Sequence, residues 1–244
     1  MKKVSLKSKL ALPIKGIQKT TLVDYPGKIA STIFLAGCNF RCPYCHNVPL
    51  LKDTEVLPDI PEAELLLLLK ERKKYIDGVC ITGGEPTLYP ELPELIKKIK
   101  ALGYQVKLDT NGSNPKMLKE LIKKKLIDHI AMDIKGSEDN YAESAGAEVD
   151  LERIRESVEL IKQGGVKYEF RTTVLPRFFK KEDAVKIGRW LAGADKYCLQ
   201  QFEKKGGVLD PQLMNEQVYS GRELHELAEI LKQTIKEVEI RGVP

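Results

Sequence analysis

The strongest constraint on the fold is a regular alternation between short apolar or β-branched runs and longer amphipathic stretches rich in Lys, Glu and Leu. Strands that alternate with helices form parallel sheets, because each helix carries the chain back to the start of the next strand. The expected strands are 32–36, 79–82, 105–109, 129–134, 168–174 and 197–201. The expected helices are 61–74, 90–102, 115–126, 151–163 and 182–191, and three of them begin with a proline, which suits a first helical turn.

Six β/α repeats without a seventh and eighth predict an α/β fold in the form of a partial (β/α)6 barrel, TIM-like, with parallel strands. Such a barrel has an open lateral face, which would admit a large substrate. We expect a single domain over residues 1–244, because the chain shows no interdomain linker. Its parts would be an N-terminal extension (1–30), the barrel core (31–203), and a C-terminal segment (204–244) with a helix over 221–236 and an edge strand over 238–240.

The composition argues against several classes of protein. Lys and Arg (40) exceed Asp and Glu (35), but the basic residues are interleaved with apolar ones and form no aromatic-studded stripe, so nucleic-acid binding is not expected. No apolar run approaches the roughly 20 residues that span a bilayer. The apolar stretch 10–14 is too short for a secretory signal. We expect a soluble, cytoplasmic protein without a membrane partner.

Three of the five cysteines, Cys38, Cys42 and Cys45, stand close together directly after an expected strand. An odd cysteine count without an export signal favours metal binding or catalysis over disulfides. Iron–sulfur clusters usually take four thiolates, so three would leave one iron of a 4Fe-4S cluster with an open position. A zinc site is the alternative. It needs a fourth ligand, and His46 abuts Cys45 too closely to supply it well.

Polar and glycine-rich residues follow the other expected strands, where parallel α/β folds gather their chemistry. They are Gly83-Gly84-Glu85-Pro86, Thr110-Asn111-Gly112 and Lys135-Gly136. A diglycine lets backbone groups approach a ligand closely, and Glu85 would brace the turn. Taken alone, the same segment is also an ordinary turn between a strand and a helix.

The CxxxCxxC spacing, with the aromatic Tyr44 before its last cysteine, and the diglycine motif after the next strand together resemble the radical S-adenosylmethionine superfamily. The resemblance covers about residues 32–202, within one radical S-adenosylmethionine domain. It implies two cofactors, a 4Fe-4S cluster and S-adenosylmethionine, whose methionine groups bind the open iron. Reductive cleavage would yield a 5′-deoxyadenosyl radical that removes hydrogen from a substrate. Gly83, Gly84 and Glu85 would lie at the methionine amino group, and Tyr44 beside the adenine, unless this tyrosine only covers the core.

The longer string GCNFRCPYCHN (37–47) resembles the glycyl-radical-enzyme activases, and the segment 15–27 resembles the activating protein of the anaerobic ribonucleoside-triphosphate reductase. By that resemblance, Asp109, Thr110 and Asp133 would surround a monovalent cation, for which oxygen ligands are suited. Asp109 and Asn111 would lie in the cofactor site, where Asp133 and Lys135 would approach methionine or ribose groups. The sequence Asp-Thr-Asn-Gly also forms turns and helix entries readily, so these residues could serve only to form the turn after the strand, without binding a cation.

Two residues of later strands complete the predicted cofactor site. Arg171 would neutralise a carboxylate or contact the ribose, unless it is only an edge or surface residue of its strand. By the resemblance, a polar contact to the adenosine would come from about Gln200, Gln201 and Phe202, and Gln201 is the candidate for it. We therefore expect an activase that removes hydrogen from a glycine of a partner glycyl-radical enzyme and receives electrons from a flavodoxin or ferredoxin type of donor. The alternatives are a radical enzyme acting on a small molecule, of the deazapurine type, and a non-catalytic zinc or nucleic-acid binding module.

Overall fold

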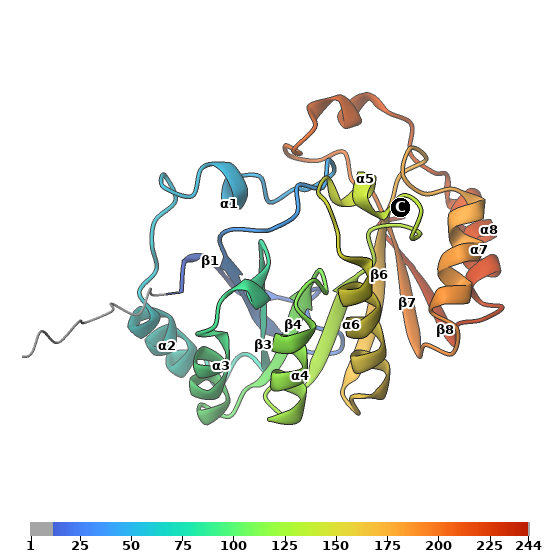
Figure 1. The fold of residues 1–244 in the computed structure, drawn as a ribbon. Coiled ribbons are helices and arrows are strands. Elements are labelled where there is room, and N and C mark those ends of the chain that lie inside the picture. The colour runs from blue at the N-terminus through green and yellow to red at the C-terminus, as the bar shows by residue number, and fades with distance from the viewer. Residues whose placement is uncertain (1–11, 244) are drawn as a thin grey trace, which may run out of the picture.

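The computed structural model describes residues 12–243, whose strands form one eight-stranded sheet in the order β1 to β8 (Figure 1). Strands β2 to β8 are parallel, and β1 runs antiparallel to β2. The strands are β1 Ile14–Thr21, β2 Ala30–Leu35, β3 Gly78–Gly83, β4 Gln105–Thr110, β5 His129–Asp133, β6 Lys167–Val174, β7 Lys196–Gln201 and β8 Glu237–Arg241. Among residues 12–243, β1 pairs only with β2 and β8 only with β7, so the sheet is open.

Helices connect the parallel strands and lie one after another along the sheet in Figure 1, from α2 to α7 and α8. They are α1 Pro49–Lys52, α2 Glu62–Glu71, α3 Leu92–Ala101, α4 Pro115–Lys123, α5 Tyr141–Ala145, α6 Leu151–Gln163, α7 Lys181–Trp190 and α8 Gly221–Leu231, with 3-10 turns at Pro86–Leu88 and Pro211–Asn215. Pro115 occupies the first turn of α4, and the Asn114 side chain accepts a hydrogen bond from the Met117 amide. Asp150 caps α6 in the same way.

The six expected strands are β2 to β7, so the predicted partial barrel with parallel strands and an open side is confirmed. The predicted edge strand at 238–240 is β8. The expected N-terminal extension needs a correction, because residues 14–21 form β1 and belong to the sheet. Residues 1–11 of that extension, and residue 244, lie outside the described residues. The prediction of a single domain over 1–244 stays a prediction.

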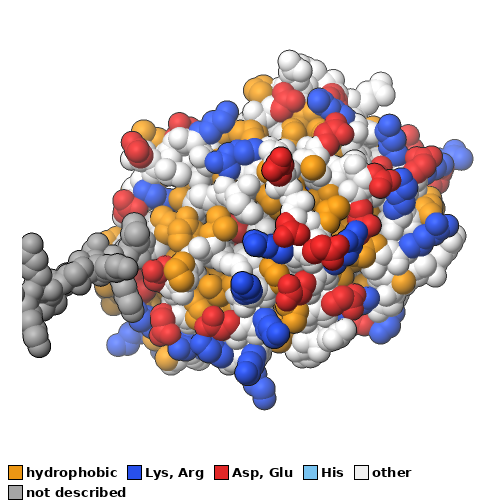
Figure 2. Space-filling model, in the orientation of Figure 1, with side chains coloured by type: hydrophobic (Ala, Val, Ile, Leu, Met, Phe, Trp, Pro, Cys, Tyr) orange, Lys and Arg blue, Asp and Glu red, His pale blue; other side chains and the backbone are white. Residues whose placement is uncertain are grey.

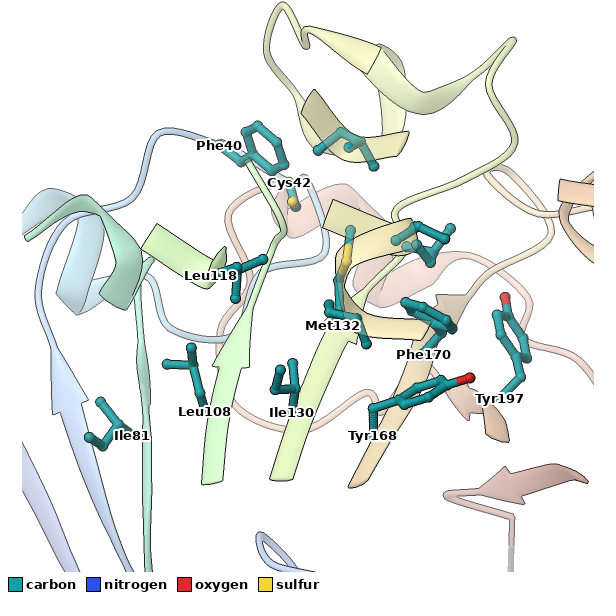
Figure 3. Close-up of a cluster of buried hydrophobic side chains, with 14 of the residues drawn as sticks. Phe40, Cys42, Ile81, Leu108, Leu118, Ile130, Met132, Tyr168, Phe170 and Tyr197 are labelled. Atoms are coloured by element: carbon teal, nitrogen blue, oxygen red, sulfur yellow. The ribbon is translucent and has the colours of Figure 1, made fainter. Parts of the chain in front are cut away.

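One face of the sheet packs an apolar layer against the helices. Figure 3 shows Ile81, Leu108 and Ile130 on neighbouring strands, and they are direct cross-strand partners. Met132 and Phe170 continue the layer as partners on β5 and β6. All five side chains are fully buried, and burying an aliphatic side chain of this size contributes about 1.5–3 kcal/mol. This layer fixes the register of the strands, since a slip by one residue would turn it to the other face.

The opposite face of the same strands is polar, because side chains alternate along a strand. It carries Lys107 on β4 and Glu169 on β6, each only 1% exposed. Glu169 accepts two hydrogen bonds, at 3.0 and 2.7 Å, from the guanidinium of Arg241 on β8. Burial of such charges is costly unless they are paired. The pairing of Glu169 with Arg241 therefore ties the last strand to the interior of the barrel.

Charged side chains of both signs are interspersed over the face of the molecule in Figure 2. Many of them form ion pairs on helix surfaces, such as Lys124 with Glu120 at 2.6 Å. Such exposed pairs contribute little to stability. Within residues 12–243, no helix combines the length and the apolar character needed to cross a membrane.

Candidate active site

A pocket of about 240 Å³ opens at the carboxyl ends of the central strands. We call it the cofactor pocket. All of the predicted site residues except Gln201 line it: Cys38, Cys42, Tyr44, Cys45, Gly83, Gly84, Glu85, Asp109, Thr110, Asn111, Asp133, Lys135 and Arg171. These residues come from the loop after β2 and from β3 to β6, and segments more than 100 residues apart in the sequence therefore meet here. The sheet topology brings them together, as the carboxyl ends of parallel strands share one edge.

The loop that carries the three cysteines begins at Gly37, which follows β2 and has a φ of +77°. A side chain at this position would collide with the Tyr89 hydroxyl group, which donates a 2.5 Å hydrogen bond to the carbonyl of Ala36. Further along, the Arg41 amide donates to the Ala145 carbonyl at 2.9 Å, and the Arg41 guanidinium donates to the carbonyl of Cys38 at 2.6 Å. These contacts hold the cysteine loop in one conformation.

The three thiols are free and differ in exposure, since Cys42 is buried and Cys38 and Cys45 are partly buried. Burial raises the pKa of Cys38 to about 11, and it raises the pKa of Cys42 and Cys45 as well. In the described part of the chain, no three His, Cys, Asp or Glu side chains gather around a single ion position. The three thiols on one loop suit a 4Fe-4S cluster, whose binding would displace their protons.

His46, the candidate fourth ligand of the zinc alternative, is engaged elsewhere. Its Nε2 atom lies 2.9 Å from the carbonyl of Glu203, and its ring packs beside Phe202 with centroids 5.5 Å apart. The neighbouring Asn47 side chain donates a 2.9 Å hydrogen bond to the Gly83 carbonyl. His46 and Asn47 therefore connect the cysteine loop to β7 and to the diglycine turn.

The diglycine turn packs against the backbone that leads into the cysteine loop. The Gly84 amide donates to the Leu35 carbonyl and the Glu85 amide to the Gly37 carbonyl, both at 2.8 Å. A Cβ atom on Gly83 would overlap the backbone of Leu35, and one on Gly84 would overlap the Gly37 carbonyl. The glycines are therefore required by this close backbone contact, in addition to any approach to a ligand.

Glu85 is fully buried, and its carboxylate joins the ends of β3 and β4. It accepts hydrogen bonds from the Thr87 amide at 3.0 Å, the Thr110 hydroxyl at 2.8 Å and the Asn111 amide at 2.6 Å, and it contacts the Thr87 hydroxyl. Burial raises the pKa of Glu85, while these donors favour its charged form. The Asn111 side chain in turn donates to the Asn39 side chain at 2.9 Å, which connects this network to the cysteine loop.

A charged cluster forms the floor of the cofactor pocket. Arg171 on β6 donates to Asp133 at 2.9 Å and to Asp109 at 3.3 Å, and Lys135 donates to Asp133 at 3.1 Å. Burial alone would raise the pKa of Asp133, but the neighbouring cations of Arg171 and Lys135 lower it to about 2. The pKa of Asp109 is lowered for the same reason by Arg171 and Lys107. Both carboxylates are therefore charged at neutral pH.

Three of the predicted residues contact other residues of the protein in this structure. Thr110 donates its hydroxyl hydrogen to Glu85, although the resemblance put it at a cation. Tyr44 is buried with its ring edge against Phe178, at 5.7 Å between centroids. Gln201 donates to the Tyr219 carbonyl at 2.5 Å and does not line the cofactor pocket.

One polar residue near the site, Lys107, was missed from the sequence, and a second, Gln200, was passed over in favour of its neighbour Gln201. Lys107 is buried on the inner face of β4 and forms an ion pair with Asp109. One signal for this ion pair was present in the sequence. Lys107 stands two residues before the candidate Asp109 in the same expected strand, so the two side chains share one face. Gln200 is the partner of Thr173 in the register of β6 and β7, so it shares the inner face with Arg171 and Thr173. Alternation along the strand could have selected Gln200 over Gln201.

Comparisons with known proteins identify the family. The sequence model of the Radical SAM superfamily matches residues 32–191. The chain is 36% identical, over 94% of its length and 96% of the relative's, to a Methanocaldococcus jannaschii protein whose name places it with the glycyl-radical enzyme activating enzymes. It is 36% identical to the pyruvate formate-lyase-activating enzyme of Clostridium pasteurianum over 52% of this chain and 54% of that protein.

A solved structure shares the fold. SuiB of Streptococcus suis, in the form bound to S-adenosylmethionine, has a TM-score of 0.64 at 17% identity, covering 84% of this chain and 48% of SuiB. Superfamily membership implies a 4Fe-4S cluster and S-adenosylmethionine as cofactors, and the three loop thiols in the cofactor pocket are a donor set that fits the cluster. The chain is therefore an enzyme of the Radical SAM superfamily, related to the glycyl-radical enzyme activating enzymes.

Proposed function

We propose that this enzyme reductively cleaves S-adenosylmethionine at a 4Fe-4S cluster and removes a hydrogen atom from a glycine of a partner glycyl-radical enzyme. The observation that carries the proposal is the meeting of the cysteine loop, the diglycine turn and the charged cluster in one pocket. The match with a relative named as an activating enzyme over nearly the whole chain supports the choice of substrate.

Cys38, Cys42 and Cys45 would hold the cluster and leave one iron open for the amino and carboxylate groups of S-adenosylmethionine. When bound, the two cofactors supply the one-electron chemistry that removes hydrogen, and the protein supplies orientation and exclusion of water. The backbone of Gly83 and Gly84 lines the same pocket and can meet the methionine amino group.

The charged cluster would bind the polar groups of S-adenosylmethionine. Lys135 lines the pocket and can pair with the methionine carboxylate, and Asp133 can accept hydrogen bonds from the amino group or the ribose. Asn111 would contribute a further amide from the end of β4, and Tyr44 would close the pocket from the loop side. The monovalent cation stays a prediction. Asp109 and Asp133, two of its expected ligands, are already paired with the side chains of Arg171, Lys107 and Lys135.

We favour an anaerobic ribonucleotide reductase as the partner, because the segments 15–27 and 37–47 resemble the activating protein of that enzyme. The expected electron donor is of the flavodoxin or ferredoxin type, and the expected location is the cytoplasm. The sheet is open between β1 and β8, which suits a macromolecular substrate whose glycine loop must reach the pocket.

Removal of single cysteines tests the cofactor assignment. Reconstituted wild-type protein with reductant and S-adenosylmethionine is expected to form 5′-deoxyadenosine, and Cys38→Ala, Cys42→Ala and Cys45→Ala are each expected to abolish it. Cys198→Ala is the matched control, because Cys198 is a buried thiol on β7 outside the pocket. Full turnover in any of the three loop variants would contradict the mechanism.

A further inference from the structure

A second hollow of about 320 Å³ adjoins the cofactor pocket, and we call it the side pocket. It is lined by residues at and after the end of β7, together with two residues from elsewhere: Gln200, Gln201, Phe202, Glu203, Lys205, His46 and Thr173. His46 and Thr173 also line the cofactor pocket, so the two hollows share a boundary. A ligand in the side pocket would therefore lie next to whatever occupies the cofactor pocket.

Gln200 stands at this shared boundary with an unused amide. Its register partner on β6 is Thr173, which places both residues on the inner face of the sheet. The hydrogen bonds within residues 12–243 include none from the Gln200 side chain. Gln201 differs, since its side chain lies on the outer face and donates to the Tyr219 carbonyl. The whole Gln200 amide is therefore free for a ligand, whereas Gln201 gives one donor to Tyr219 and its buried Oε1 atom accepts no hydrogen bond from the described residues.

The wall of the side pocket is held in place by its own contacts. The His46 ring lies against Phe202 at 5.5 Å between centroids, and the His46 Nε2 atom contacts the Glu203 carbonyl at 2.9 Å. An aromatic wall of this kind accepts an apolar group by packing. The side pocket thus offers the free Gln200 amide on the side of the cofactor pocket and an aromatic surface beside it, and the charged pair of Glu203 and Lys205 completes its lining.

These features match the peptide backbone around a glycine. A glycine has no side chain to recognise, so a site that selects it must bind the flanking peptide groups, each of which has one N–H donor and one C=O acceptor. The Gln200 amide supplies the complementary acceptor and two donors. We propose that the side pocket binds the peptide backbone beside the substrate glycine and that Gln200 makes the hydrogen bonds that position it, an inference that rests on the proposed function.

The smallest probe of this site is N-acetylglycine N-methylamide, which contains one glycine and its two flanking peptide groups. In protein labelled with ¹⁵N on glutamine side chains, without cofactors, we expect the probe to shift the Gln200 amide resonance saturably. The Gln201 resonance is the internal control and should stay in place, because its amide is held by Tyr219. The loss of one resonance in Gln200→Leu and of another in Gln201→Leu assigns the two signals. A Gln200 resonance that does not move overturns the proposal.

A second measurement uses the reconstituted enzyme and the same probe with deuterium on the glycine Cα. If Gln200 positions the peptide, Gln200→Leu should raise the KM for the probe about tenfold, because one hydrogen bond to the probe is lost. The kcat should stay within about twofold of wild type. Gln200→Glu, which keeps the acceptor only, should give an intermediate KM. Equal losses in kcat and kcat/KM would overturn the positioning role.

The two experiments separate this proposal from the proposed function. If the Gln200 resonance shifts but 5′-deoxyadenosine gains no deuterium, the proposed hydrogen source is wrong and the peptide site stands. If deuterium is transferred while the Gln200 resonance does not move, the proposed function stands and the peptide site is wrong.

Discussion

Glu85 shows how one side chain can organise the candidate active site. Its carboxylate is fully buried and accepts hydrogen bonds from residues on both sides of the β3 and β4 ends. Thr110 already accepts a hydrogen bond from the Gly112 amide at 3.1 Å, so its hydroxyl hydrogen is directed to Glu85. All groups around the carboxylate are thus donors, which only an acceptor can satisfy.

We expect Glu85→Gln to destabilise the fold by about 2–4 kcal/mol, because the new amide NH₂ would face backbone and hydroxyl donors in a buried position. Urea unfolding followed by circular dichroism measures the loss. Glu71→Gln at an exposed position of α2 is the matched control and should change stability by less than about 0.5 kcal/mol. Equal stability of Glu85→Gln and wild type would show that the carboxylate is not required.

At this scale, residue types and spacing predicted most of the pocket but not the directions of side chains. Cys38, Cys42 and Cys45 were found from spacing alone, because three thiols in eight residues are rare. Gln201 lies outside the cofactor pocket and lines the adjoining side pocket, because strand alternation places Gln200 on the inner face of β7. The predicted contact of Gln201 with the adenosine stays a prediction. The interior ion pair of Lys107 was missed because a lysine in a strand normally indicates an exposed position.

At the scale of elements, the diglycine turn is a contact between two strands. Gly83 and Gly84 of this turn have no side chains that could pack against neighbours. Their backbone instead lies directly on the end of β2. The cysteine loop starts from that same end of β2. The spacing between β2 and β3 at this edge therefore fixes where the cysteine loop begins.

A methyl group at Gly84 should separate these two segments. Gly84→Ala would place a Cβ on the Gly37 carbonyl, so we expect a loss of at least about 2 kcal/mol in stability and a reduced iron content after reconstitution. Gly207→Ala is the matched control, because a Cβ there meets no atom within 4 Å. Iron quantification and thermal unfolding of both variants check the prediction. An iron content in Gly84→Ala equal to that of Gly207→Ala would contradict it.

Element prediction succeeded where periodicity is strong and failed where an element depends on a distant partner. Helix α6 has the bounds predicted from its amphipathic pattern, and its N-cap Asp150 marks its start. Strand β1 was missed because its sequence, IKGIQKTT, is polar and partly exposed and lacks clear alternation. It is stabilised by pairing with β2, which the local sequence does not reveal.

At the scale of the whole molecule, the two ends of the barrel differ in chemistry. The carboxyl end holds the cofactor pocket, and at the opposite end the β1–β2 loop places Tyr25 over His129 at the start of β5, with ring centroids 5.9 Å apart. His129 is 8% exposed, and its Nδ1 atom has no hydrogen-bond partner within the described residues. Burial and the nearby Lys107 lower the pKa of His129 to about 4.

This lowered pKa predicts a pH-dependent stability. Between pH 6.5 and pH 4 the unfolded chain binds a proton at His129 that the folded protein does not, so the free energy of unfolding should fall as the pH drops through this window. The loss is at most about 3 kcal/mol. Urea unfolding at pH 7 and pH 4.5 should show a smaller difference for His129→Gln than for wild type. His225→Gln, at an exposed position of α8, should behave as wild type. An identical pH dependence in wild type and His129→Gln would contradict this prediction.

The arrangement of the whole molecule could be predicted because it follows from one repeated unit. Six β/α repeats define a parallel sheet whose carboxyl edge must contain the site. The ion pairs of the polar inner face below the pocket were not predicted. They join residues as far apart as Glu169 and Arg241, and no local pattern encodes such pairing.

We propose above that the enzyme takes hydrogen from a glycine of a protein partner. The most direct measurement is electron paramagnetic resonance of reconstituted enzyme incubated anaerobically with reductant, S-adenosylmethionine and an anaerobic ribonucleotide reductase. A pyruvate formate-lyase is tested in parallel, and each partner is prepared with and without α-deuterated glycine. We expect a glycyl radical on a partner, a change in its hyperfine splitting on deuteration, and deuterium in the 5′-deoxyadenosine. Formation of 5′-deoxyadenosine with no protein radical and no deuterium transfer would contradict this proposal.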